Sequence, residues 1–217
     1  MHLGCTDTGS AMTATAKKRK KKDGRALRAE RSRQAVARAM LDLIRESEGD
    51  PRPTAAAVAE RAGVSLRLVF HHFKDMDAVL RHAMDLQALR IAPLVPIDLG
   101  PCRSVDEKVT AFCERRAMLY EEITPTRRAA NTAASSSPKL AENLTHFRAA
   151  KRDQLAYLFR DEVGALPEEL RAARLAAAQQ ATSWMAWESL RAHQGLDVAG
   201  ATEVMAASLR ALLGGGA

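Results

Sequence analysis

Residues 54–73 read TAAAVAERAGVSLRLVFHHF, the segment of the sequence that says most about its structure. Thr54 and Ser65 are residue types whose hydroxyl groups accept hydrogen bonds from the free N–H groups at a helix start. Gly63 suits the left-handed position just after a helix end. The spacing therefore predicts two short helices joined by a tight glycine turn, which is a helix-turn-helix.

The two predicted helices have an inward face and an exposed face. The apolar residues placed to pack them together are Val58, Ala59, Ala62, Val64, Val69 and Phe73. The second helix then exposes Leu66, Arg67, Leu68, His71 and His72. Such a helix fits the major groove of DNA, which is about 12 Å wide. Arg67 is the predicted base-reading residue, because a guanidinium can donate two hydrogen bonds to guanine.

The positive charge of the chain is concentrated at one end. Residues 1–90 contain 18 Lys/Arg and 11 Asp/Glu, whereas residues 91–217 contain 15 of each. This asymmetry predicts contact with a polyanion, nucleic acid first and an anionic membrane surface second. Within the basic end lies the run Lys17, Lys18, Arg19, Lys20, Lys21 and Lys22. We expect residues 1–24 to be a disordered basic arm. Phosphate contact, entry into an adjacent minor groove and a solvating tail without a partner all stay open.

Composition indicates an all-α chain, with 42 alanines and only 4% aromatic residues. Strands would need more β-branched and aromatic side chains than this sequence offers. Apolar periodicity, caps and prolines predict nine helices: about 25–48, 55–62, 66–73, 76–91, 105–122, 125–134, 138–162, 167–193 and 198–213. The expected organisation is the arm 1–24, a three-helix DNA-binding domain over 25–75, and a second helical domain over 76–217, to which the family resemblance described below assigns effector binding and dimerisation.

Several other classes of function are not expected. The longest apolar run is five residues long, and no apolar segment follows the lysine run, so we expect a cytoplasmic protein without a membrane span or signal peptide. His71, His72 and His82 lack partners at metal-ligand spacing, and no catalytic motif is present, so no metal, cofactor or enzyme activity is expected. Cys5, Cys102 and Cys113 form no close-spaced motif; redox sensing by Cys102 or Cys113 remains a weaker hypothesis.

Three short motifs resemble the DNA-binding domain of the tetracycline-repressor (TetR) family of bacterial transcriptional regulators. They are Ala62-Gly63-Val64-Ser65, Phe70-His71-His72-Phe73 and the following Val79-Leu80. The resemblance covers about residues 30–85. It implies that Thr54 and Ser65 lie near phosphates, that Leu66, Arg67, Leu68 and His71 face bases, and that His72 meets the DNA backbone or packs.

The sequence departs from the family pattern at four positions. Arg67 replaces the usual glycine, Leu68 a threonine, Phe70 a tyrosine and Met76 a lysine. Phe70 and Met76 cannot donate hydrogen bonds to phosphate, which puts anchoring through these positions in doubt. The basic arm with Arg28, Arg31 and Lys74 is expected to supply contacts in their place.

The resemblance also implies a second, divergent helical domain that binds a ligand and dimerises. The large side chains able to line a cavity there are Phe112, Met118, Leu119, Tyr120, Phe147, Tyr157, Trp184, Met185 and Trp187, although such residues also form plain cores. The expected effector is a small, mostly apolar molecule. The expected protein is a repressor that binds double-stranded DNA at a palindromic operator as a homodimer through residues 167–213. The alternative is an architectural DNA-binding protein without an effector.

Overall fold

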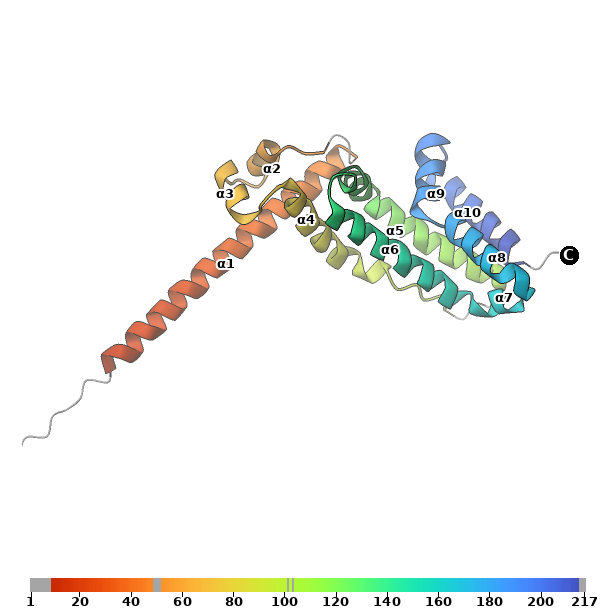
Figure 1. Cartoon of the computed structure of the whole chain (residues 1–217), viewed down its shortest axis with the longest axis horizontal. Helices are drawn as coiled ribbons and strands as arrows, with labels where there is room; N and C mark the ends of the chain where they lie inside the picture. Colours follow the sequence, from red (N-terminus) through yellow and green to blue (C-terminus); the bar gives the residue numbers. More distant parts are fainter. Residues whose placement is uncertain (1–8, 49–51, 101, 103, 215–217) are drawn as a thin grey trace, which may run out of the picture. The chain divides into compact units, whose positions relative to one another are not determined.

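The computed structural model describes residues 9–48, 52–100, 102 and 104–214, with side chains from residue 26 onward (Figure 1). Over these residues the chain is all-α and contains no strand, as the sequence predicted. The chain folds into two compact units. The N-terminal unit comprises Met1–Leu43 and Pro53–Ala83, and the C-terminal unit comprises Ile44–Arg52 and Met84–Ala217. The boundary lies within a helix, after Ala83, and not before residue 76 as expected.

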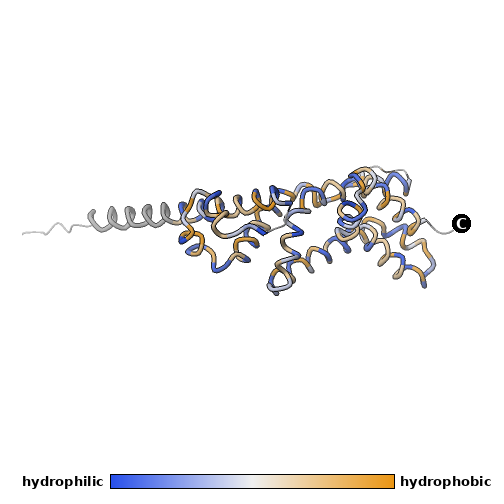
Figure 2. Tube along the Cα trace, turned by 90° about the horizontal axis from the view of Figure 1, so that it is seen from above, coloured by the Kyte–Doolittle hydropathy of each residue, from blue (hydrophilic) through white to orange (hydrophobic). Residues whose placement is uncertain are grey.

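The described part of the chain contains ten α-helices and two short helical segments of other types. They are α1 (Gly9–Glu46), α2 (Ala55–Arg61), α3 (Leu66–His72), α4 (Met76–Ile91), the 3-10 turn η1 (Ala92–Leu94), α5 (Val105–Ala134), α6 (Pro138–Leu158), α7 (Arg160–Ala165), α8 (Glu168–Ala181), α9 (Trp184–Glu188), the π-helical turn η2 (Ser189–His193) and α10 (Val198–Leu213). Apolar and polar residues alternate along these helices at short intervals, which is typical of helices with one buried face (Figure 2).

The N-terminal unit buries apolar residues from each of its helices. The residues with less than a tenth of their surface exposed are Val36, Ala37, Ala39, Met40, Leu41, Val58, Ala59, Val69, Phe73, Val79, Leu80 and Ala83. Val58, Ala59, Val69 and Phe73 were predicted to pack the helix-turn-helix, and their burial is confirmed. Ala62 and Val64 are only half-buried.

Helix α1 begins at Gly9, well before the start at about Arg25 that the sequence predicted. The helical backbone therefore includes residues 9–24, where a disordered arm was expected. Alanine and lysine both have high helix propensity, so a helix that is stabilised by packing near Val36 can extend through a lysine-rich stretch. Residues 1–8 lie outside the described residues.

The core of the C-terminal unit is built mainly on α5. Helix α5 packs against α6 and α10, and α10 also packs against α8 (Figure 1). Phe112 and Phe159 meet edge to face at 5.2 Å between ring centroids, and Tyr120 lies 6.1 Å from Trp187. These four rings are buried in one apolar cluster.

Helix α5 runs through Pro125 without a break, so the two predicted helices 105–122 and 125–134 are one. Proline lacks the N–H that would bond to the carbonyl four residues earlier. Side chains supply other hydrogen bonds at this place. The Thr124 hydroxyl donates to the Tyr120 carbonyl at 2.6 Å, and the buried Gln87 amide donates to the Glu122 carbonyl at 3.0 Å. The sequence alone does not show these hydrogen bonds.

Two long predicted helices are shorter in the structure. The helix over 138–162 ends at Leu158, and α7 follows. The helix over 167–193 breaks after Ala181, where Ser183 starts a new helix by accepting a hydrogen bond from the Ala186 N–H at 3.1 Å. Serine competes for backbone groups and favours helix starts over helix interiors, which explains this break.

Candidate nucleic-acid interface

The helix-turn-helix is fixed by two side-chain caps and one glycine. The Thr54 hydroxyl accepts from the Ala57 N–H, and the Ser65 hydroxyl accepts from the Leu68 N–H, each at 3.2 Å. Gly63 has φ of +65°, a left-handed conformation that glycine adopts without a steric penalty. These features set the direction in which α3 leaves the turn, so they also set which of its side chains are exposed.

The exposed face of α3 differs from the predicted one at three residues, namely Leu68, Phe70 and His72. Leu66 and Phe70 are 45% and 48% exposed, and Arg67 and His71 are exposed beside them. Leu68, which was predicted to face bases, is half-buried. Phe70 takes its place. Residues 66, 67, 70 and 71 share one face at the helical period of 3.6, so the spacing alone would have identified Phe70.

His72 lies toward the interior of the N-terminal unit. Its Nε2 atom is buried and has no hydrogen-bond partner among the described residues. Burial lowers the pKa of His72 from its ordinary value, and the positive charge of Arg33 and the nearby His71 lower it further. The sequence left this histidine either at the DNA backbone or packed inside; its geometry favours packing in the neutral form.

The N-terminal unit presents several exposed cations. Arg28, Arg31, Arg67 and Lys74 are all exposed. Among the described residues, no carboxylate pairs with Arg67. The side chains of Lys17, Lys18, Arg19, Lys20, Lys21 and Lys22 lie outside the described residues, so the predicted phosphate contacts of this run stay a prediction.

Replacing Ser65 with alanine is expected to lower the free energy of unfolding by about 1 kcal/mol, because the Leu68 N–H then loses its partner. Chemical denaturation of the full chain measures the change. Ser65→Asp is the matched control, since a carboxylate also caps a helix. Equal destabilisation by both substitutions would show that the cap contributes nothing at this position.

The nine large side chains named as able to line a ligand site are divided among different places, with Tyr157 exposed and Trp187 fully buried in the core. Tyr120, Phe147, Trp184 and Met185 line one cavity of about 380 Å³ in the C-terminal unit. Leu119 and Phe147 line an adjoining cavity of about 210 Å³. Met118 lines a separate hollow, and Phe112 is fully buried in the core. The larger cavity also has lining residues that the prediction missed, and five of these are basic.

Three other expectations concern metals, thiols and membranes. Within the described ranges, no three His, Cys, Asp or Glu side chains gather as a metal site would require. Burial raises the pKa of Cys113 to about 12, which keeps its thiol protonated and weighs against redox sensing there. Cys5 lies outside the described residues. None of the described helices combines the length and apolarity needed to cross a bilayer.

Two bacterial proteins are among the solved structures that share this fold. A transcriptional regulator from Rhodococcus sp. Rha1 matches with a TM-score of 0.64 and 18% identity over 84% of this chain and 96% of its own. A protein from Pseudomonas aeruginosa PAO1, also described as a transcriptional regulator, matches with a TM-score of 0.61 and 19% identity over 88% of this chain and 92% of its own. No protein-family model and no curated protein matches the chain. At such identities, the likeness establishes the all-α fold.

Proposed function

We propose that this protein is a DNA-binding transcriptional regulator of the TetR type that reads operator DNA with helix α3. The observation that supports this most is the exposed face of α3, where Arg67 is exposed together with the apolar side chains of Leu66 and Phe70. The description of both fold neighbours as transcriptional regulators agrees with it. The proposal also accounts for the charge excess in residues 1–90.

Three side chains on this face each suit one part of a base edge in the major groove. Arg67 would donate two hydrogen bonds to O6 and N7 of a guanine. The apolar side chains of Leu66 and Phe70 would contact thymine methyl groups, which only the major groove presents. Thr54, Ser65 and Lys74 would lie near phosphates, with Arg28, Arg31 and the run Lys17–Lys22 adding contacts to the DNA backbone.

The regulator would act as a homodimer through residues 167–213. Helices α8 and α10 pack against each other and leave apolar side chains exposed, among them Leu170, Val198 and Val204. Such a surface on two copies can form a two-fold interface. The dimer would place its recognition helices about 34–36 Å apart, or a multiple of that, on a palindromic operator.

A repressor of this kind would be released by a ligand bound in the C-terminal unit. Helix α4 contributes its first half to the N-terminal unit and its second half to the C-terminal unit. The second half lines the 210 Å³ cavity through Met84, Gln87, Ala88 and Ile91. A ligand that displaces α4 would change the placement of α3, with a coupling free energy of about 1–3 kcal/mol.

Selection of bound sequences from a random DNA pool at about 150 mM salt tests the proposal, because non-specific binding is weakened there. The expected result is one enriched palindrome, which full-length protein binds as a dimer. Absence of any enriched sequence would contradict specific regulation. It would favour an architectural protein that depends on its basic arm.

A further inference from the structure

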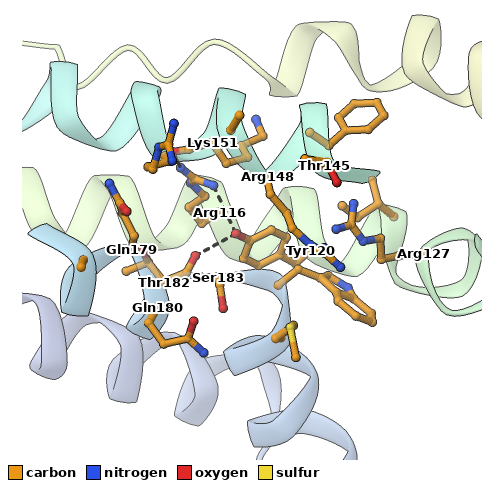
Figure 3. Close-up of a pocket in the computed structure, with 17 residues that line it drawn as sticks. Arg116, Tyr120, Arg127, Thr145, Arg148, Lys151, Gln179, Gln180, Thr182 and Ser183 are labelled. Carbon is orange, nitrogen blue, oxygen red and sulfur yellow. Dashed lines mark hydrogen bonds between the residues drawn. The ribbon is translucent and has the colours of Figure 1, made fainter. Parts of the chain in front are cut away.

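The 380 Å³ cavity of the C-terminal unit has an unusual charge. Helices α5, α6 and α8 supply most of its walls (Figure 3). Five of its lining residues are basic, namely Arg116, Arg127, Arg148, Lys151 and Arg152. No Asp or Glu is among the described residues that line it. Residues 91–217 contain equal numbers of acidic and basic side chains, so the basic cavity is a local feature of the fold.

Two of these guanidinium groups, those of Arg116 and Arg127, each have a buried Nε–H donor without an acceptor among the described residues. Arg116 is 1% exposed; it donates to the Tyr120 hydroxyl at 3.1 Å and to the Lys151 carbonyl at 2.8 Å, while its Nε has no partner among the described residues. The buried Nε of Arg127 also lacks a partner, and its guanidinium lies over the ring of Trp184 at 5.6 Å. Buried cationic donors without an acceptor are costly, so the folded chain retains a penalty that an anion would remove.

Elsewhere in the same unit, two partly buried cations have carboxylate partners. Lys108 pairs with Glu162 at 2.8 Å, and Arg128 pairs with Glu188 at 2.7 Å. At these two sites the fold neutralises a partly buried cation with one of its own acids. In the cavity that partner is missing, with the exception of Arg152, which meets the exposed Asp153 at 3.4 Å. A bound anion would neutralise the cations of the cavity, as Glu162 neutralises Lys108 and Glu188 neutralises Arg128.

An apolar space adjoins the basic one. The 210 Å³ cavity shares Ile123, Arg127, Phe147 and Lys151 with the larger cavity. Most of its remaining walls are apolar, namely Met84, Ala88, Ile91, Val95, Leu119 and Ala150. The larger cavity is therefore basic and the smaller one is mostly apolar, and Arg127 and Lys151 line both.

We propose that these two cavities bind an amphipathic organic anion, with its carboxylate against Arg116, Arg127, Arg148 and Lys151 and its apolar body against the side chains of α4 and α5. This replaces the sequence-based expectation of a mostly apolar effector. The role of the ligand in regulation rests on the proposed function. Binding of the ligand is independent of the proposed function, because the site lies wholly within the C-terminal unit.

Calorimetric titration of the full chain at pH 7, without DNA, tests the ligand class. The probes are phenylacetate and octanoate, each paired with a neutral relative, phenylacetamide and 1-octanol, and inorganic phosphate as a small anion. We expect each carboxylate to bind at least about 10-fold more tightly than its neutral relative, because hydrogen bonds to charged groups are the stronger ones. Inorganic phosphate is expected to bind more weakly than both acids, since it has no apolar part.

Lys151→Gln and Lys139→Gln form a matched pair of variants. Both residues lie on α6 and both substitutions remove one charge, but Lys139 is exposed and does not line the cavity. We expect a loss of about 10-fold in carboxylate affinity for Lys151→Gln and none for Lys139→Gln. Arg148→Gln is a second cavity variant at an exposed position, so the test survives if Lys151→Gln does not fold.

Three results would overturn the proposal: equal binding of acids and neutral relatives, equal effects of the Lys151 and Lys139 variants, or no binding of either acid. Phosphate binding as tightly as the acids would overturn the amphipathic class. None of these results would affect the DNA selection experiment, and failure of that selection would leave anion binding intact. The two proposals can therefore fail separately.

The pH dependence of binding gives an independent readout. Burial, with the nearby positive charge of Arg116, lowers the pKa of Lys151 to about 8. The other charged groups of the cavity wall are Arg127 on α5 and Arg148 and Arg152 on α6, whereas α8 contributes the neutral Gln179 and Gln180. A bound carboxylate would raise the pKa of Lys151. Affinity should therefore be constant between about pH 6 and 7, where both the ligand carboxylate and Lys151 are charged, and fall by up to about 10-fold per pH unit above pH 8. A flat profile between pH 7 and 9 would contradict a role for Lys151.

Discussion

Replacing all six residues of the run Lys17–Lys22 with alanine is expected to flatten the salt dependence of DNA binding. Each phosphate that a cation neutralises adds about 0.9 to the magnitude of the negative slope of log affinity against log salt concentration. Six cations therefore contribute up to about 5 to this magnitude. With that slope, binding changes about 10³-fold between 50 and 200 mM salt. The variant should lose most of this change.

Titrations of a fixed operator sequence at several salt concentrations measure the slope. The control carries alanine at Lys139 and Arg160, two exposed cations of the C-terminal unit, and should keep the slope of the parent chain. The preferred DNA sequence should not change in either variant. A slope that is the same with and without the run would mean that residues 17–22 do not contact phosphates.

Arg67→Ala is expected to remove discrimination at one base pair of each half-site. A bidentate contact to guanine contributes about 1–3 kcal/mol, so the preference for guanine should fall by about 5–150-fold. The salt slope should stay nearly unchanged, because Arg67 is assigned to a base and not to a phosphate. This separates its effect from that of the lysine run.

Arg67→Lys is the sharper companion variant. Lysine retains the positive charge but loses the planar pair of donors, so it should lose much of the discrimination while keeping overall affinity. Binding to operators with each base at the affected position gives the measurement. Should Arg67→Ala select the same sequence with the same discrimination, the assignment of Arg67 as the base-reading residue would be wrong.

The helix-turn-helix could be predicted from the sequence because its determinants are local. Thr54, Gly63 and Ser65 act within three residues along the chain, and the structure shows the caps and the turn that these residue types favour. The boundary of the exposed face was less accurate, since Leu68 and Phe70 are close in sequence and are separated only by their position around the helix.

The continuation of α5 through a proline involves a residue that is distant in sequence. Pro125 was expected to start a helix, but Gln87 supplies a hydrogen bond to the Glu122 carbonyl from another helix. The basic cavity was missed for a similar reason. Arg116, Arg127 and Lys151 come from two helices and carry no shared motif, so only the fold brings them together.

The positions of the two tryptophans have a practical consequence. The chain has only two, Trp184 in the wall of the basic cavity and Trp187 in the core with no exposed surface. The Trp184 indole donates to the Thr124 hydroxyl at 3.0 Å, and the Arg127 guanidinium lies over its ring. Its fluorescence should respond to occupancy of the cavity, whereas that of Trp187 should respond to unfolding. A Trp187→Phe chain would thus carry a single native optical reporter beside the site.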